Sequence, residues 1–176
     1  TGDNGSGKSA LINTAMKHFS EIGEPYYFWS GENMPTKSMA RLISALTLIP
    51  TRKIESGAFI SSTSDKALVD AAIAKADKGY LDGGAMSISK LRRVIPVMKR
   101  KGIEIIFLDR LELFDEVQNA KSSEQIAARG KVCTQLRSLC NVYGITICCV
   151  AQFKNPESGR AHTGYPYKYN IYGGSQ

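Results

Sequence analysis

The first residues of the chain carry the feature that most restricts its fold. Residues Gly2 to Ser9 read Gly-Asp-Asn-Gly-Ser-Gly-Lys-Ser and match the pattern G-x-x-x-x-G-K-[ST]. Glycines let a backbone wrap closely around an anion, so that several N–H groups point at it. In such a loop the Lys8 ammonium reaches the β- and γ-phosphates of a nucleoside triphosphate, and the Ser9 hydroxyl ligates Mg²⁺. The motif predicts a phosphate-binding loop whose ligand contacts come from Asn4, Gly5, Ser6, Gly7, Lys8, Ser9 and Ala10.

A phosphate-binding loop normally joins a buried strand to a helix whose N-terminus faces the phosphates. The helix is predicted over Lys8–Ile22, where apolar residues recur at helical spacing, and Gly23 should end it. The chain begins one residue before the loop. We therefore expect that the strand before the loop is absent and that the chain is a fragment.

Composition narrows the class of protein. A length of 176 residues favours one domain, and an apolar content of 43% is enough for a packed core. The sequence contains no run of 18 apolar residues, so no membrane span is expected. The net charge of +7 favours a polyanionic partner, nucleic acid first, although a basic enzyme that binds only nucleotide fits equally well. The cysteines lack the spacing of a zinc site and are expected to be buried thiols in a reducing cytosol: Cys133, Cys140, Cys148 and Cys149.

Strand and helix signals alternate along the chain, which predicts an α/β fold with a mainly parallel sheet flanked by helices. Strands are expected at Tyr26–Ser30, Ala58–Ile60, Tyr80–Leu81, Ile103–Leu108 and Ile145–Val150. Further helices should start at Pro35, at a Ser64 cap, at a Ser87 cap and at a capping box made by Ser122 and Gln125. The last helix should bury Ile126, Cys133, Leu136, Cys140 and Tyr143 and end at Gly144.

Polar residues at predicted strand ends complete the candidate site. Asp109 follows the apolar run Ile-Glu-Ile-Ile-Phe-Leu, where a carboxylate that orients Mg²⁺ is expected. Glu32, just past Tyr26–Ser30, is slightly favoured as the base that activates water, with Glu112 and Glu116 as rivals. Gln152 ends the last strand, where its amide can bind the γ-phosphate and respond to its loss.

The segment 153–172 is polar, aromatic and rich in Gly and Pro, and we expect a long loop. It combines cations with aromatic rings, a combination that suits the backbone and the stacked bases of single-stranded nucleic acid. The cations are Lys154, Arg160, His162 and Lys168, and the rings are Tyr165, Tyr167, Tyr169 and Tyr172. A second basic cluster, between residues 90 and 101, spreads around a predicted helix and is interpreted as a solvated face.

Taken together, these segments resemble the motor domain of ring-shaped replicative helicases. This family comprises the DnaB proteins, the phage primase-helicases and mitochondrial Twinkle, all with RecA-like cores. The resemblance covers nearly the whole chain and rests on the phosphate-binding loop, Phe-Trp-Ser-Gly-Glu-Asn-Met, Ile-Ile-Phe-Leu-Asp-Arg-Leu-Glu-Leu and Ile-Thr-Ile-Cys-Cys-Val-Ala-Gln. The segment from Phe153 to His162 is similar to the DNA-binding loop of phage primase-helicases. Residues 1–176 are thus expected to form one RecA-like helicase ATPase domain, truncated at both ends.

The resemblance implies roles for particular residues. It places the catalytic glutamate on Glu32, supports Asp109 as the magnesium carboxylate and Gln152 as the phosphate sensor, and implies that Lys154 and Arg160 contact the DNA backbone. Tyr172 stands where the family has an arginine, in a turn that here reads Tyr-Gly-Gly-Ser-Gln, so this position departs from the family pattern. The family's arginine finger and subunit-linking helix should lie outside the chain. The fragment is therefore expected to be a poor hexamer and a poor ATPase.

The implied activity is ATP-driven 5′-to-3′ unwinding by a homo-hexamer that moves along single-stranded DNA, with ATP or another nucleoside triphosphate and Mg²⁺ as cofactors. A primase domain or primase partner is compatible with the resemblance. The cytoplasm of a bacterium or a phage-infected cell is expected, and a mitochondrial location also fits. The rival functions are a recombinase-like ATPase without unwinding activity, a small-molecule kinase with the same loop, and a nucleotide-binding module without catalysis.

Overall fold

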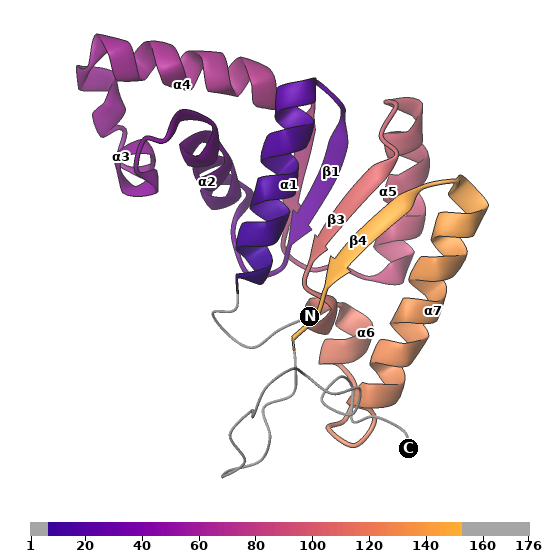
Figure 1. Cartoon of the computed structure of the whole chain (residues 1–176). Coiled ribbons are helices and arrows are strands. Elements are labelled where there is room, and N and C mark those ends of the chain that lie inside the picture. Colours follow the sequence, from indigo (N-terminus) through magenta and orange to yellow (C-terminus); the bar gives the residue numbers. More distant parts are fainter. Residues whose placement is uncertain (1–6, 153–176) are drawn as a thin grey trace, which may run out of the picture.

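A computed structural model describes residues 7–152 (Figure 1). Helices and strands alternate along this part of the chain, as the sequence predicted. The elements are α1 (Lys8–Ile22), β1 (Tyr26–Ser30), α2 (Pro35–Thr47), α3 (Thr51–Glu55), η1 (Ala58–Ser61), α4 (Thr63–Ala76), β2 (Gly79–Gly83), α5 (Ile88–Arg100), β3 (Ile105–Asp109), η2 (Leu111–Leu113), α6 (Asp115–Gln118), α7 (Gln125–Tyr143) and β4 (Thr146–Val150). None of the helices in residues 7–152 is both long and apolar enough to cross a bilayer.

The described strands form one sheet in the order β2-β1-β3-β4, and every pairing is parallel. The predicted α/β class with a parallel sheet is therefore confirmed. In the pairing register Ser30 lies beside Asp109, and Asp109 lies beside Val150. The carboxyl ends of β1, β3 and β4 consequently meet at one edge, which is also the end of the sheet where α1 begins (Figure 1). Residues that directly follow these strands are thus brought together.

Helices cover both faces of the sheet and create two apolar cores. Figure 1 shows α1, α2 and α4 on one side and α5 and α7 on the other. Tyr26 and Phe28 of β1 belong to the core beneath α1, whereas Tyr27 and Trp29 belong to the core beneath α5 and α7. All five residues of β1 are buried. A strand buried on both faces reads as a continuous apolar run, and this is why β1 could be predicted from sequence.

Several predicted boundaries match the structure. Helix α1 has the predicted bounds, and Gly23 ends it with a φ of 73°. The Ser87 side chain accepts a hydrogen bond from the Lys90 N–H at the start of α5. Gly144 ends α7 in the left-handed region, with a φ of 58°. These positions were predictable because caps and left-handed turns depend on local residue type.

Two predictions in the α3–α4 region were wrong. Ala58–Ile60 does not form a strand but lies in the short 3-10 helix η1, which follows Gly57 at a φ of 72°. A three-residue apolar run cannot distinguish a strand from one helical turn, and no strand of the described sheet pairs with it. The α4 cap is Ser62 rather than Ser64, because the Ser62 hydroxyl accepts from the Asp65 N–H.

The start and the buried face of α7 also differ from the prediction. The helix begins at Gln125 after Glu124, whose side chain makes no capping hydrogen bond, so the predicted capping box is wrong. Its buried residues are Val132, Leu136 and Leu139. Of the predicted face, Ile126 and Cys133 are exposed and Leu136 is buried. The helix lies against α5 and α6 as well as the sheet, and sequence periodicity contains no information about those neighbours.

Strand β4 is less buried than its apolar sequence suggested. Thr146 and Cys148 are exposed, because within residues 7–152 the strand pairs only with β3. All four cysteines are free thiols, and Cys133 and Cys148 are exposed. The prediction of four buried thiols was therefore wrong.

Candidate active site

The N-terminus of α1 presents backbone N–H groups at the predicted phosphate site. Gly7 precedes the helix with a φ of 83°, and a glycine has no side chain that could cap the first turn. The first turn contains no acidic residue, so no carboxylate within it neutralises the positive end of the helix dipole. Lys8, Ser9 and Ala10 form this first turn, and Gly7 and Ala10 are exposed. Asn4, Gly5 and Ser6 lie outside the described residues.

Ser9 and Asp109 come from opposite parts of the sequence and meet at the carboxyl edge of the sheet. The Ser9 hydroxyl donates a hydrogen bond of 2.8 Å to Asp109 Oδ2. Asp109 is only 2% exposed. The pKa of its carboxyl group is raised above the ordinary value, chiefly by burial. The Ser9 hydrogen bond lowers this pKa, and the negative charge of Glu32 raises it. The charges of Arg110 and Lys8 act in the lowering direction.

A buried carboxylate bonded to a single hydroxyl fits a magnesium ion better than a transition metal. No cluster of three or more His, Cys, Asp and Glu side chains that could hold a metal occurs among residues 7–152. Mg²⁺ does not require such a cluster, since it usually keeps several waters and uses one or two carboxylates together with substrate phosphates. The residues that could hold it here are Ser9 and Asp109.

Glu32 lies two residues beyond β1, at the same edge of the sheet. The Ser30 hydroxyl accepts hydrogen bonds from the N–H groups of Glu32 and Asn33, at 3.3 and 3.1 Å. The Gly31 N–H donates to the carbonyl oxygen of Asp109 at 2.8 Å, so that the backbone before Glu32 is attached to the end of β3. The Glu32 side chain is partly exposed to solvent.

The two rival glutamates are engaged in structural contacts. Glu112 is 8% exposed, and its Oε1 accepts a hydrogen bond from the Gln152 N–H. Glu116 Oε1 accepts a hydrogen bond from the Ile88 N–H at the start of α5. Both carboxylates thus accept hydrogen bonds from backbone groups of other segments, whereas the Glu32 side chain is 39% exposed and is paired with Arg110.

Arg110 connects these groups and was not singled out by the sequence analysis. Its Nη1 hydrogen-bonds to Gln152 Oε1 and lies 3.1 Å from Glu32 Oε1. Its Nε lies 3.9 Å from Glu112 Oε2. The sequence signal was present, because a charged residue directly after the strand-end Asp109 must lie at the site. The particular contacts of Arg110 with Glu32 and Gln152 could not be read from the sequence, because they depend on strand order and register.

The structure therefore brings together six residues: Lys8, Ser9, Glu32, Asp109, Arg110 and Gln152. The predicted DNA contacts lie outside the described residues, as does Tyr172. These contacts are Lys154, Arg160, His162 and Lys168.

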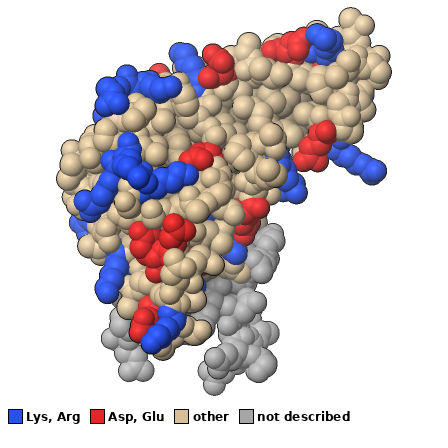
Figure 2. Space-filling model, turned by 180° about the vertical axis from the view of Figure 1, so that it is seen from behind, with Lys and Arg blue, Asp and Glu red and all other residues tan. Residues whose placement is uncertain are grey.

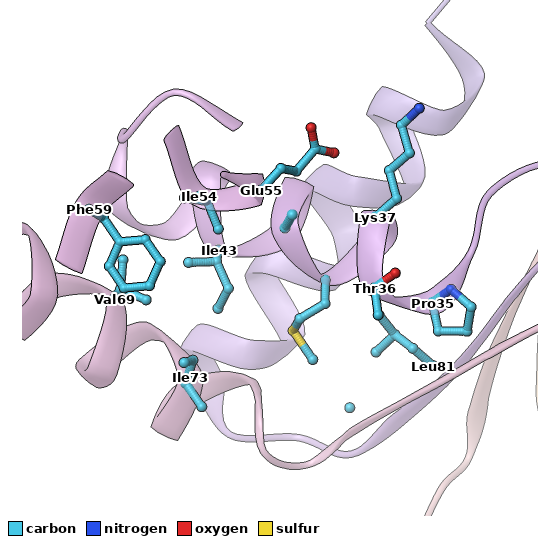
Figure 3. A pocket seen from close by; sticks show the side chains of 13 residues that line it. Pro35, Thr36, Lys37, Ile43, Ile54, Glu55, Phe59, Val69, Ile73 and Leu81 are labelled. Atoms are coloured by element: carbon cyan, nitrogen blue, oxygen red, sulfur yellow. The ribbon is translucent and has the colours of Figure 1, made fainter. Parts of the chain in front are cut away.

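A large apolar groove lies away from this site. It has a volume of about 900 Å³ and runs between α2, α3, η1, α4 and β2, with Phe59, Val69 and Ile73 among its walls (Figure 3). None of the six residues of the site lines it. A smaller hollow of about 300 Å³ does adjoin the site, and its walls include Ser9, Ala10 and Arg41.

Positive charge is distributed over the surface of the described residues. In the second basic cluster, Lys90 pairs with Asp82 and Lys99 with Glu104, while Lys101 lies over the Tyr80 ring. Figure 2 shows the basic side chains of one face in separate groups with acidic side chains between them. This arrangement agrees with a solvated face.

Comparisons with known proteins point to one family. The family described as "DnaB-like helicase C terminal domain" matches residues 1–164. One solved structure, described as an "ATPase Domain", is 18% identical, with a TM-score of 0.74, and the match covers 88% of this chain and 56% of that one. Another, "The Structure Of A DnaB-Like Replicative Helicase And Its Interactions With Primase", is also 18% identical, with a TM-score of 0.74, and the match covers 88% and 38%. The chain thus spans about half the length of these structures or less. No curated protein matches it.

Proposed function

The chain belongs to the family of DnaB-like helicase C-terminal domains, and from this premise we propose that it is the ATP-hydrolysing motor of a hexameric replicative helicase. One observation carries the proposal: the hydrogen bond of 2.8 Å between Ser9 and Asp109, with Glu32 and Gln152 at the same sheet edge. This arrangement unites a helix N-terminus for phosphates, two oxygen ligands for a hard cation, an accessible base and an amide donor.

Each group has a distinct task in this proposal. The first-turn N–H groups of α1 and the Lys8 ammonium would bind the phosphates of ATP, and Ser9 and Asp109 would hold Mg²⁺. A bound Mg²⁺ would neutralise charge on the β- and γ-phosphates. Glu32 orients a water molecule and accepts its proton. Gln152 hydrogen-bonds the γ-phosphate and responds to its loss.

The proposed assembly, direction of movement and DNA contacts of the motor follow from the family resemblance. We infer that the motor acts as a homo-hexamer, moves 5′ to 3′ on single-stranded DNA, and grips the strand through residues 153–172. A primase domain or partner is compatible with this assembly, and the cytoplasm remains the expected location.

Replacement of Lys8 tests the nucleotide site. In a full-length protein that carries this domain, Lys8→Ala should abolish ATP hydrolysis measured by phosphate release with single-stranded DNA present. Lys17→Ala is the matched control, because Lys17 lies on the same helix in an exposed ion pair with Glu21, and such pairs contribute little. Wild-type turnover in the Lys8→Ala protein would refute the assignment. DNA-independent turnover in the wild type would favour a small-molecule kinase.

The DNA contacts need a separate test. Lys154→Ala combined with Arg160→Ala should reduce the magnitude of the negative slope of log affinity against log salt by about 1.4. Each single-strand phosphate contact contributes about 0.7 to this slope. Fluorescence anisotropy with a labelled oligonucleotide measures the slope. Exposed Arg92 and Arg93 on α5 provide a control pair of equal charge. An unchanged slope would show that the DNA contacts lie elsewhere.

A further inference from the structure

Arg110 lies where the carboxyl ends of three adjacent parallel strands are side by side. It directly follows β3, while its partners Glu32 and Gln152 follow β1 and β4. One nitrogen, Nη1, contacts both partners: it hydrogen-bonds to Gln152 Oε1 and lies 3.1 Å from Glu32 Oε1. The base and the phosphate sensor of the proposed motor are thus joined through one atom of a third residue.

The chemistry of this contact makes the two partners dependent on each other. A guanidinium group is planar, keeps its charge and presents its donors in a rigid fork. The Arg110 side chain is only 20% exposed, so water cannot easily replace a lost partner. If the Gln152 amide turns toward a phosphate, Nη1 loses one acceptor and its contact with Glu32 Oε1 must readjust. That oxygen is one of the two with which Glu32 can accept a proton from water.

A purely structural role for Arg110 would be to neutralise the buried Glu112. The geometry argues against this as its main function, because Arg110 Nε lies 3.9 Å from Glu112 Oε2 and neither atom has a hydrogen-bond partner within residues 7–152. The contacts with Glu32 and Gln152 are closer. Glu112 instead receives the Gln152 N–H at 3.1 Å, which holds the backbone of the sensor beside Arg110.

We propose that Arg110 is a positioning residue that couples the carboxylate of Glu32 to the side-chain amide of Gln152. In the structure, Arg110 holds both groups together. When the γ-phosphate hydrogen-bonds to Gln152, the contact between Arg110 and the Glu32 carboxylate changes. Glu32 is then positioned to orient water when a triphosphate is present. This inference rests on the function proposed above and adds a residue to that site.

A double-mutant cycle tests the coupling. In a full-length protein that carries this domain, Arg110→Met and Gln152→Ala should each lower kcat for ATP at least tenfold, and Arg110→Met should change the affinity for a non-hydrolysable ATP analogue less than threefold. If the two residues act as a unit, the double variant should lie within threefold of the slower single variant. A double variant whose loss equals the product of the two single losses would overturn the proposal.

Two further variants separate positioning from charge and from folding. Arg110→Lys keeps the charge without the planar fork and should remain at least fivefold below the wild type in kcat; full recovery would overturn the coupling role. Because Arg110→Met leaves the buried Glu112 unpaired, the same cycle is also run with Glu112→Gln present, which removes that charge. Arg93→Met, on the exposed surface of α5, is the matched control and should leave kcat unchanged.

Thermal unfolding of every variant is measured alongside the kinetics. A loss of activity explained entirely by loss of folded protein would assign Arg110 a structural role and overturn the proposal. A full-length wild-type protein that carries this domain and hydrolyses no nucleoside triphosphate would overturn both the proposed function and this inference. An active wild type with independent effects at Arg110 and Gln152 would overturn the inference alone.

Discussion

Gly31 is the position at which a single added methyl group should disturb both stability and the placement of the base. The residue does not have a positive φ, so its backbone conformation does not require glycine. The lack of space for a side chain requires glycine here. A Cβ at this position would lie 2.7 and 2.8 Å from Leu113 Cδ1 and Cβ, and 3.0 Å from the Trp29 ring. Trp29 is fully buried, and the Cβ of Leu113 is fixed to the backbone of η2. The methyl group therefore cannot be accommodated by rotating one flexible side chain.

Gly31→Ala should cost about 1–3 kcal/mol of stability, the usual range for overpacking, or roughly 2–12 °C in Tm for a chain of this length. The backbone of Gly31 also leads directly into Glu32, and a displacement of about 1 Å in a catalytic group can lower kcat on the order of 100-fold. We therefore expect a larger effect on kcat than on the affinity for nucleotide.

Gly130→Ala is the matched control. Gly130 lies inside α7, and an added Cβ there has no described atom within 4 Å. The substitution should raise stability by about 0.4–1 kcal/mol through lower backbone entropy in the unfolded chain. Urea unfolding and steady-state ATPase assays on both variants measure the two effects. Equal stability of the Gly31→Ala and wild-type proteins, with equal kcat, would refute the packing argument.

Two carboxylates should affect stability in opposite directions. Burial raises the pKa of Asp109, so its charged form destabilises the ligand-free fold at neutral pH, and this cost disappears as the pH falls through the raised pKa. Asp109→Asn should therefore raise the Tm of the ligand-free protein at pH 7 while weakening Mg²⁺-dependent nucleotide binding; a lower Tm would contradict this. For Asp82, burial raises the pKa, but hydrogen bonds from Tyr27 and Lys90 outweigh it and the net pKa is lowered. Its stabilisation is complete above about pH 4 and is lost at lower pH. Asp82→Asn should thus be less stable at pH 7, with a difference from the wild type that shrinks in urea unfolding as the pH falls below about 4; a constant difference would exclude this linkage.

The strongest local signals were reliable predictors of structure. The bounds of α1, the strand Tyr26–Ser30 and the turn at Gly144 follow from apolar periodicity and glycine chemistry. The approximate meeting of Glu32, Asp109 and Gln152 was also predictable, because parallel strands place their carboxyl ends at one edge. Short apolar segments were less informative, and η1 was mistaken for a strand because three residues fit either structure.

The sequence by itself determined the phosphate-binding motif, the α/β alternation and the polar residues at the strand ends, because each depends on residues close together in the chain. Only the tertiary structure decided which side chains touch at the site. Ser9 reaches Asp109 across 100 residues, and Arg110 shares one nitrogen between Glu32 and Gln152. Such contacts depend on strand order and register, which arise when the whole sheet packs between its two layers of helices.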